Sequence, residues 1–594
     1  MNSNDTISAL PRDGSRFEGI PAVAGRAIGP AWVVHARLDE IPNRTVAPDG
    51  IDSEIARFHA AVHATRQQIL DLMNEVSRRI GPGEASLFDA HLMVVDDGFL
   101  KTRVERLIRE RTACAEAAVH QVTEEFSAQF ATMRDAYLRE RSIDVLDIGR
   151  RILRNLMGVS ETIPATFDQP HMIIADDLTP SQTVGLPRDG VLGLITDRGS
   201  ATSHTAIIAR ALGIPAVVGV KHVSGDVRSG DTVLLDGYNG TVIVRPTPQE
   251  QSAFKRAAEA HRKAAVDWRR SRNVRAETPD GHVVAVLANA DHTSNLSQLG
   301  SRGSEGIGLY RTESLWMELG REPDEDEQTT AYRDILRAMG NRPVVIRVLD
   351  LGGDKVCGAL TERAEANPFL GLRSIRYLLK ERQVFRRQLR AILRASTCGD
   401  VQIMYPMICD VEELKEANAL LEQCKAELDA EGVPFKAALR AGAMIEIPSA
   451  ALTAHILARH ADFLCLGTND LVQYTLAVDR VNENVATLYQ PTHPSVLTLI
   501  RHTVKAGKRY KRPVSVCGEM AADPILAVLL MGMGVDTLSM TPTAIPEVKH
   551  AIRKTPYSEA AKLARSVAAH ASTAADALRM CRALLSRTAP ELLS

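Results

Sequence analysis

The chain has 594 residues, which is too long for a single hydrophobic core and predicts two or three domains. Charged residues make up 24% of the chain, and 71 Lys and Arg against 73 Asp and Glu leave a formal net charge of -2, which excludes a basic field for nucleic acid. Eight scattered cysteines without a Cys-x-x-Cys pair argue against structural zinc and a disulfide framework, and no apolar run is long enough for membrane insertion, so we expect a cytoplasmic protein.

The first elements of the chain are extended and then helical. The polar segment before Phe17 has no apolar core and is expected to be neither a signal peptide nor an anchor. Residues 17–34 are punctuated by Gly and Pro and predict a strand pair. From Ile51 to about Gly158 apolar residues recur at intervals of three and four, which predicts an antiparallel helical bundle over 51–158.

After the bundle the hydrophobic period changes to short apolar runs separated by turns. These runs lie between Met172 and Val244 and indicate a compact α/β module. The early extended segment needs sheet partners that a helical bundle cannot supply. We therefore expect the bundle to be inserted into a discontinuous α/β domain made of residues 17–50 and 159–245.

One segment of this module carries candidate chemistry. Gly199 is followed by Ser200-Ala201-Thr202-Ser203-His204, and Arg210 lies shortly after. A glycine turn and Ser or Thr caps at a helix start leave backbone N–H groups and the positive end of the helix dipole beside the imidazole, where a phosphoryl group can be held. His204 is therefore the candidate phosphate carrier; a capping or packing histidine is the alternative.

The next segment, 246–277, is charged and rich in Ala, Lys and Arg, without a strong apolar stripe. It is typical of a helical linker. A charged helix on a domain surface is equally compatible with this composition.

Residues 278–594 contain eight strand-like runs with helical material between them, which fits a closed (β/α)8 barrel better than its rival, an open doubly wound sheet. The runs are Val283–Leu287, Gly306–Leu309, Val344–Leu349, Gln402–Tyr405, Ala443–Ile445, Phe463–Leu466, Pro513–Val516 and Thr537–Met540. The chemistry of a barrel lies at the C-terminal ends of its strands.

Ionisable residues follow several of these runs. In a closed barrel Arg311, Arg347 and Arg480 would ring one mouth together with the carboxylates of Glu446 and Asp470. Arginine forks suit phosphate and carboxylate oxygens, and two carboxylates leave most of an octahedral shell to water and ligand, as Mg²⁺ prefers. A phosphorylated carboxylic acid bound with Mg²⁺ fits both, although an arginine after a strand is often a surface ion pair and Glu446 could cap the next helix.

Two further features are weaker. Cys517 ends an apolar run before a glycine and could donate a proton to a carbanion or enolate, although most buried cysteines only pack. The segment from Asp177 to Thr183 supplies hydroxyl groups that could orient His204, or it is an ordinary turn that opens a helix.

Taken together, the motifs resemble the enzyme I family of the bacterial phosphoenolpyruvate-dependent phosphotransferase system, over nearly the whole length from Phe17. Thr202-Ser203-His204 through Arg210 resembles the phosphohistidine motif of that family, and Leu466–Gln473 resembles its second signature. Four more ordered motifs match: Gly308–Glu313, Asp350–Lys355, Asn367–Arg373 and Leu488–Pro491.

The resemblance implies a transferase, a kinase acting on protein histidine, that phosphorylates itself on His204 from phosphoenolpyruvate and releases pyruvate. Carried over by motif, Glu446 and Asp470 hold Mg²⁺, Cys517 protonates the enolate, and a hydroxyl such as that of Thr183 positions His204. The same resemblance assigns substrate binding to Arg311, Arg347, Asn469 and Arg480.

For the domains, the resemblance implies a swivelling phosphohistidine α/β domain whose inserted bundle docks the small phosphocarrier HPr. The barrel would bind phosphoenolpyruvate and form a homodimer, in a system that serves sugar transport and regulation.

Two other functions are compatible with parts of the sequence. The pyruvate phosphate dikinase and phosphoenolpyruvate synthase group shares the phosphohistidine module and the barrel, but needs a nucleotide-binding domain for which this chain has no glycine-rich phosphate loop. A regulatory protein that only senses phosphoenolpyruvate is the non-enzymatic alternative. That alternative would be favoured if one of four residues were missing. All four are present: His204, Glu446, Asp470 and Cys517.

Overall fold

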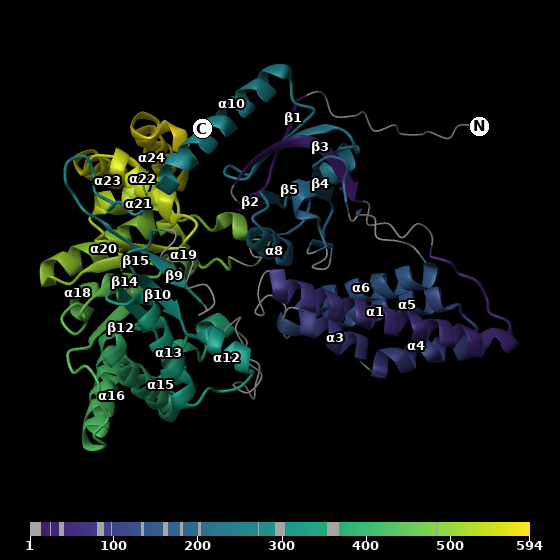
Figure 1. The fold of residues 1–594 in the computed structure, drawn as a ribbon, viewed down its shortest axis with the longest axis horizontal. Helices are drawn as coiled ribbons and strands as arrows, with labels where there is room; N and C mark the ends of the chain where they lie inside the picture. Colours follow the sequence, from purple (N-terminus) through teal and green to yellow (C-terminus); the bar gives the residue numbers. More distant parts are fainter. Residues whose placement is uncertain are drawn as a thin grey trace. The chain divides into compact units, whose positions relative to one another are not determined.

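Figure 1 presents the chain as a computed structural model that forms two compact units, one up to Lys255 and the other from Arg256. The structure describes residues 14–593 except for positions 24, 35–40, 80–87, 97, 132–135, 159–163, 165, 179–181, 184, 200–202, 271, 292–302, 353–366, 481, 483 and 484. Among the described residues no helix is both long and apolar enough to cross a membrane.

Eight strands of the first unit form one sheet in the order β1-β8-β7-β3-β4-β5-β6-β2. The strands are β1 (Ser15–Glu18), β2 (Ile20–Val23), β3 (Arg26–Val34), β4 (His171–Ala175), β5 (Val191–Thr196), β6 (Ala216–Val218), β7 (Thr232–Asp236) and β8 (Thr241–Val244). The expectation of an α/β module after the bundle is confirmed.

The strand pair predicted within residues 17–34 is wrong, because that segment forms three strands and none of them pairs with another. Instead β1 pairs with β8, β2 pairs with β6, and β3 lies between β7 and β4. Pro21 in β2 lacks an N–H and is tolerated because β2 is an edge strand. An alternating pattern identifies a strand, but it does not identify the later strand that will form backbone hydrogen bonds with it.

The helical bundle lies between β3 and β4 in the chain, yet these two strands are parallel neighbours with Ala31 opposite Met172. The bundle helices are α1 (Ile51–Arg79), α3 (Asp89–Asp96), α4 (Gly98–Arg111), α5 (Ala115–Ala131) and α6 (Ala136–Met157). Their apolar stripes, such as Phe58 and Val62 on α1, pack into one core. The sheet is thus built from segments on both sides of the bundle, as the insertion requires; the domain boundaries themselves stay a prediction.

The rest of the first unit is short, and one long helix follows it. Between β5 and β6 lies α8 (His204–Leu212), and α9 (Val223–Asp226) precedes β7. Two 3-10 turns are η1 (Pro48–Gly50) and η3 (Arg188–Gly190). The predicted linker contains α10 (Pro248–Arg270), which runs across the division between the units at Lys255.

The second unit is a closed barrel of eight parallel strands, so the open-sheet alternative is wrong. The strands are β9 (Ala285–Ala290), β10 (Ile307–Arg311), β11 (Pro343–Arg347), β12 (Asp400–Tyr405), β13 (Arg440–Ile445), β14 (Leu464–Leu466), β15 (Val514–Val516) and β16 (Thr537–Met540). The barrel closes where β16 pairs with β9, with Thr537 opposite Ala285. Each of the eight predicted runs overlaps one of these strands.

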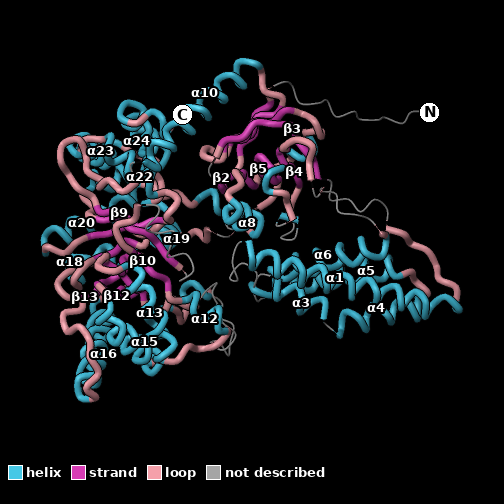
Figure 2. Tube along the Cα trace, viewed as in Figure 1, coloured by secondary structure: helices cyan, strands magenta, loops and turns pink. Residues whose placement is uncertain are grey.

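Helices cover the outside of the barrel (Figure 2). The longer ones are α13 (Glu325–Met339), α15 (Arg382–Ala395), α16 (Val411–Ala430), α20 (Pro494–Tyr510), α21 (Pro524–Met533), α22 (Ile545–Lys554), α23 (Tyr557–His570) and α24 (Ala574–Thr588). The shorter ones are α12 (Glu313–Leu319), α14 (Ser374–Lys380), α17 (Pro448–Leu452), α18 (Ala454–Leu457) and α19 (Thr468–Leu476). The 3-10 turns are η5 (Pro368–Leu370), η6 (Ser396–Cys398), η7 (Ala486–Leu488), η8 (Glu519–Ala521) and η9 (Pro590–Leu592).

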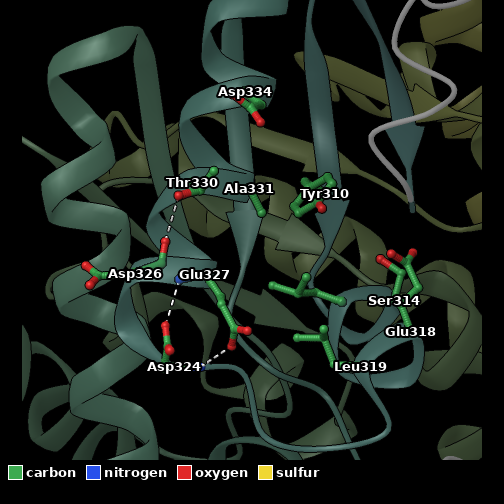
Figure 3. A pocket seen from close by; sticks show the side chains of 11 residues that line it. Tyr310, Ser314, Glu318, Leu319, Asp324, Asp326, Glu327, Thr330, Ala331 and Asp334 are labelled. Carbon is green, nitrogen blue, oxygen red and sulfur yellow. Dashed lines mark hydrogen bonds between the residues drawn. The ribbon is translucent and has the colours of Figure 1, made fainter.

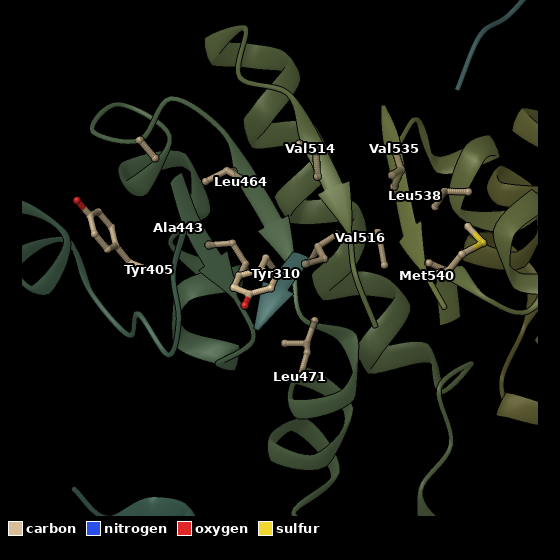
Figure 4. Close-up of a cluster of buried hydrophobic side chains, with 14 of the residues drawn as sticks. Tyr310, Tyr405, Ala443, Leu464, Leu471, Val514, Val516, Val535, Leu538 and Met540 are labelled. Carbon is tan, nitrogen blue, oxygen red and sulfur yellow. The ribbon is translucent and has the colours of Figure 1, made fainter. Parts of the chain in front are cut away.

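Alternation along the strands divides the buried residues of the barrel between two clusters. Figure 4 shows part of the large one, with Ala443, Leu464, Val514 and Leu538 coming from four successive strands. The small one takes the intervening positions and contains Leu309, Val345, Met404, Met444, Phe463, Cys465 and Cys517. Because successive side chains of a strand point to opposite faces, we assign the small cluster to the barrel interior.

Candidate active site

The candidate site residues lie where the inward-facing positions reach the C-terminal ends of the strands. Arg311, Arg347 and Glu446 each come two positions after an interior residue, namely Leu309, Val345 and Met444. A step of two keeps a side chain on the same face of a strand, so these groups continue the interior column beyond its apolar part. The sequence therefore changes from packing to polar chemistry at one end of the barrel.

Arg347 is held by two carboxylates. Its Nη2 donates to Glu313 Oε1 at 2.9 Å, and its Nη1 lies 2.8 Å from Asp350 Oδ2. All three residues are buried, and Glu313 Oε1 also accepts the backbone N–H of Asp350 at 2.7 Å. The charges of Asp350 and Glu313 raise the pKa of Arg347 against the opposing effect of burial, so the guanidinium stays charged.

A second buried arginine, Arg373, shares the carboxylate of Asp350. Its Nη2 donates to Asp350 Oδ1 at 3.2 Å and its Nη1 donates to Tyr474 Oη at 3.3 Å. Tyr474 in turn donates to the carbonyl oxygen of Phe369 at 2.6 Å, which ties α19 to the loop before Arg373. The Nε atoms of Arg347 and Arg373 are buried and have no hydrogen-bond acceptor within the described part of the chain. Two positively charged hydrogen-bond donors without an acceptor favour the binding of an anion.

Glu446 follows β13 and is 2% exposed. Burial raises its pKa well above the ordinary value, and the negative charges of Asp470 and Asp350 add to that effect. Its Oε1 accepts the backbone N–H of Met407 at 2.6 Å. Met407 adopts a φ of 55°, an uncommon conformation for a residue with a side chain, and this places its N–H at the carboxylate.

Asn469 and Asp470 lie in the first turn of α19. Asn469 Oδ1 accepts the backbone N–H of Glu519 at 2.8 Å, which connects the segments after β14 and β15. The two segments approach so closely that a Cβ on Gly518 would overlap Thr468 Oγ1. Thr468 Oγ1 is buried and finds no partner among the described residues. Glycine is therefore required at this contact.

Arg311 and Arg480 are more accessible than Arg347. Arg311 Nη1 donates to Asp291 Oδ1 at 3.0 Å. Arg480 is half-buried and its backbone N–H donates to Gln473 Oε1 at 3.3 Å. Its charge lowers the pKa of Tyr489, which burial raises overall and the charges of Glu519 and Asp470 raise further. Arg480 and Asp470 thus act on the same phenol.

Cys517 lies beside Cys465 in the barrel interior. Cys465 on β14 is opposite Ser515 on β15, so Cys517 comes two positions later on the same face. Contact with Cys465 and then burial raise the pKa of the Cys517 thiol, while the charges of Arg347 and Arg311 oppose the rise. A thiol that stays protonated at neutral pH can act as a proton donor.

These interactions connect the predicted residues electrostatically. Glu446 responds to the charges of Asp470 and Arg347, and Cys517 responds to those of Arg347 and Arg311. Arg480 and Asp470 both act on Tyr489. The individual roles of Arg311, Arg347, Asn469, Arg480, Glu446, Asp470 and Cys517 stay predictions.

The carboxylates provide a test of whether a divalent cation fits. Glu313 is paired with Arg347, and Asp350 is paired with Arg347 and Arg373. Burial is the first cause of the raised pKa of Glu446, and the negative charges of Asp470 and Asp350 add a repulsion. A cation near Glu446 and Asp470 would relieve it. No group of three or more His, Cys, Asp or Glu able to hold a metal occurs within the described ranges. Two carboxylates with substrate and water completing the shell suit Mg²⁺, so the residues fit.

One described cavity lies elsewhere. It has a volume of about 510 Å³ between α12 and α13 (Figure 3) and is lined by Tyr310, Ser314, Leu315, Glu318, Leu319, Asp324, Asp326, Glu327, Thr330, Ala331 and Asp334. It includes none of the predicted site residues. Its five carboxylates and lack of a basic side chain disfavour an anionic substrate.

The second candidate site lies in the first unit at the start of α8. Ser203 is its N-cap and its side chain accepts from the N–H of Ala206, as the motif predicts. Gly199 has a φ of 109°, which favours glycine. His204 is the first residue of the helix; its side chain lies outside the described part of the chain, as do Ser200, Ala201 and Thr202.

The surroundings of α8 differ from the expectation in one respect. Arg210 lies in the last turn of the helix and its Nη2 donates to the carbonyl oxygen of Ala22 at 2.9 Å, so it does not belong to the helix start. Thr205 Oγ1 donates to the carbonyl oxygen of Leu178 at 2.8 Å, and Thr183 is fully buried. Of the expected hydroxyl loop, Thr179, Pro180 and Ser181 lie outside the described residues.

Sequence reasoning missed Glu313, Arg373 and Tyr474 as members of the network. Glu313 and Arg373 are the last residues of two motifs quoted for the family resemblance, and that position was the available signal. Tyr474 follows the second signature directly. Sequence spacing could not show which carboxylate pairs with which guanidinium, because the paired residues follow different strands of the barrel.

Comparisons with known proteins agree over most of the chain. Three family models match: "PEP-utilising enzyme, N-terminal" over residues 18–141, "PEP-utilising enzyme, mobile domain" over 167–240 and "PEP-utilising enzyme, PEP-binding domain" over 265–557. A phosphoenolpyruvate-protein phosphotransferase of Geobacillus stearothermophilus is 40% identical over 551 residues, which cover 93% of this chain and 95% of that protein. One of Listeria innocua is 39% identical over 564 residues, covering 95% and 98%. An NMR structure of an Enzyme I protein is 36% identical, covers 41% of this chain and 99% of that chain, and has a TM-score of 0.37.

Proposed function

The chain belongs to the phosphoenolpyruvate-protein phosphotransferase family of transferases, and from this we propose that it moves the phosphoryl group of phosphoenolpyruvate to His204 and then to HPr. The observation that carries the proposal is the pair of buried arginines, Arg347 and Arg373, whose Nε donors have no acceptor among the residues that the structure describes. They lie beside the carboxylates of Glu446 and Asp470, which act electrostatically on Arg373. An anion and a cation together would satisfy both sets of groups.

In this mechanism Glu446 and Asp470 would hold Mg²⁺, which when bound neutralises charge on the substrate. Arg311, Arg347, Asn469 and Arg480 bind the phosphoryl and carboxylate oxygens and align the substrate, in addition to Arg373. The bond between the phosphorus and the enol oxygen breaks, a bond forms between the phosphorus and a nitrogen of His204, and the electron pair stays on the enolate oxygen.

The enolate then takes a proton at its terminal carbon. Cys517 supplies it, leaving a thiolate and releasing pyruvate. The charges of Arg347 and Arg311 already favour the thiolate, and so they stabilise the product of this step. A thiol with a raised pKa keeps its proton until the enolate, a stronger base, is formed.

The domains have separate tasks in the proposal. Residues 17–50 and 159–245 carry His204, residues 51–158 dock HPr, and residues 278–594 bind phosphoenolpyruvate. On the bundle, Met93 and Phe99 are 65% and 69% exposed, and the ring of Phe99 stacks on Phe126. Such an exposed apolar surface supports docking of a partner protein. The segment 246–277 with α10 serves as the hinge on which His204 moves between two partners.

The barrel is proposed to form a homodimer. Leu370, Leu452 and Leu488 are each more than half exposed on its loops and helices, and a second copy would cover apolar surface of this kind. Sedimentation of the purified protein tests this, and a monomer at micromolar concentration contradicts it. The seven described cysteines are free thiols, which supports action in the cytoplasm. Sugar uptake and its regulation are proposed as the process served, on the resemblance of the motifs to the enzyme I family.

The decisive experiment uses phosphoenolpyruvate labelled in its phosphoryl group. With Mg²⁺, the wild type is expected to acquire acid-labile label and His204→Ala to acquire none. Adding HPr is expected to move the label to that carrier. Label from ATP in the absence of phosphoenolpyruvate, or equal labelling of His204→Ala, contradicts the proposal.

A further inference from the structure

Asp350 contacts both buried arginines of the barrel mouth, Arg347 and Arg373. One oxygen of its carboxylate is 2.8 Å from Arg347 Nη1 and the other accepts from Arg373 Nη2 at 3.2 Å. Asp350 is 2% exposed, and Arg347 and Arg373 are 5% and 3% exposed. Two guanidinium groups buried side by side repel each other unless an anion lies between them.

The backbone around Asp350 is fixed by the same groups. Its N–H donates to Glu313 Oε1, and Ser374 N donates to the carbonyl oxygen of Leu351 at 2.9 Å. A Cβ on Gly352 would overlap the side chain of Arg373, so the two segments touch directly. The carboxylate of Asp350 therefore has little freedom to follow a displaced arginine.

We propose that Asp350 is a positioning residue that uses one carboxylate to fix Arg347 and Arg373 as a pair, with the Nε–H of each left for the anionic substrate. The inference rests on the proposed function for the identity of that substrate. Asp350 occupies an Nη of each guanidinium, and Glu313 and Tyr474 occupy the other. The buried Nε of each guanidinium has no hydrogen-bond partner in the described ranges of the chain.

The carboxylate of Asp350 is expected to weaken the binding of the substrate and to improve its alignment. The negative charge of Asp350 weakens the attraction of the site for any anion, because it already neutralises part of the guanidinium charge. In return it holds both arginines in one geometry, which lowers the reorganisation needed in the transition state. Removing the charge should therefore strengthen anion binding and slow the reaction.

The test is Asp350→Asn in the full-length protein, with inorganic phosphate as the probe of anion binding. We expect kcat for phosphorylation by phosphoenolpyruvate to fall on the order of tenfold or more. The inhibition constant of phosphate, competitive with phosphoenolpyruvate, should fall by roughly threefold, meaning tighter binding. A variant that is merely destabilised loses active protein but does not bind phosphate more tightly.

Two controls sharpen the result. Glu313→Gln removes a charge beside Arg347 but leaves the carboxylate of Asp350 in contact with both arginines, so its effect on phosphate should be smaller than that of Asp350→Asn. Asp523→Asn changes a partly buried carboxyl elsewhere, which caps α21 by accepting from Ile525 N and Leu526 N, and should leave the phosphate constant unchanged. Asp350→Glu should restore part of kcat together with weaker phosphate binding.

An unchanged kcat in Asp350→Asn, or phosphate binding that weakens in parallel with kcat, overturns the inference. Calorimetric titration with phosphate gives the same comparison without turnover. If the wild type is not labelled by phosphoenolpyruvate, the proposed function fails, whereas tighter phosphate binding by Asp350→Asn would still support the role of Asp350.

Discussion

Glu313 and Arg347 form a buried ion pair of 2.9 Å between the end of one barrel strand and the end of the next. Both side chains are nearly inaccessible, at 5% and 6% exposure. A pair of this kind is costly to break because the remaining charge stays buried without its partner. The polar mouth of the barrel is therefore also part of its stability.

We expect Glu313→Ala to lower the free energy of unfolding of the barrel by about 3–5 kcal/mol. Urea denaturation followed by tryptophan fluorescence measures it, since Trp316 is buried on the same helix as Glu313. The control is Glu318→Ala on the exposed side of that helix, with an effect of about 0.5 kcal/mol or less. Equal losses in the two variants would contradict the assignment.

Cys465→Ala is expected to lower the pKa of the Cys517 thiol, because contact with Cys465 is the leading cause that raises it. The rate of alkylation of Cys517 by iodoacetamide, measured against pH, should rise at a lower pH than in the wild type. Cys581→Ala removes a buried thiol of α24 and should leave the profile of Cys517 in place. A profile that Cys465→Ala does not move excludes the contact.

Gly518→Ala should reduce kcat on the order of a hundredfold, because its Cβ would collide with Thr468 Oγ1 and displace Asn469 next to it. Steady-state formation of pyruvate measures the change. Gly225→Ala is the matched substitution, since a Cβ at Gly225 meets nothing within 4 Å, and it should retain wild-type rates. Comparable activity in both variants would show that the segments after β14 and β15 can separate freely.

Divalent cation binding is expected to depend on the two carboxylates of the mouth. Mg²⁺ should raise the melting temperature of the wild type, and EDTA should reverse the shift. Glu446→Gln and Asp470→Asn should each abolish the shift, because each removes one of the two proposed protein ligands. Asp326→Asn, in the acidic cavity of Figure 3, should keep it. Loss of the shift in that control alone would place the cation in the cavity.

The stability of the barrel is expected to fall as the pH rises from about 4.5 to 7 through Glu547. Burial, helped by the charge of Asp523, raises the pKa of Glu547 from 4.5 to about 7. Between these values the folded protein holds a proton that the unfolded chain has released, so increasing pH favours unfolding. Glu547→Gln removes this dependence. As the pH rises from 5 to 8, the free energy of unfolding of the variant should increase relative to that of the wild type, on the order of 1–2 kcal/mol. Thermal melts at both pH values measure the difference, and parallel pH dependence in the two proteins contradicts it.

Much of the barrel could be predicted from the sequence because its strands are short apolar runs between helices. The same runs predict polar groups near the strand ends. In the structure Arg311 and Arg347 close their strands, and Glu446 and Cys517 follow theirs directly. The pattern could not identify pairing. The partners of β1 and β2 come from later strands, and hydrophobic periodicity contains no information about which edge meets which.

The charge network was beyond sequence reasoning for a related reason. Arg347 and Asp350 are close in sequence, but Glu313 and Arg373 reach them only through the closure of the barrel and the course of the loop before α14. The sequence analysis grouped Arg210 with His204 because both belong to one motif. In the structure α8 has nine residues, and Arg210 lies in its last turn, about two turns from the start of the motif.

The pairing of Ser15 with Val244 has a consequence for biosynthesis. When the first three strands leave the ribosome, the bundle and the later strands that complete their sheet have not yet been translated. The bundle, with its local contacts, can fold on the nascent chain. Until the later strands are made, the backbone N–H and C=O groups of β1 and β3 stay unpaired. Slow translation between the two halves of the sheet would prolong that exposure and increase the demand for chaperones.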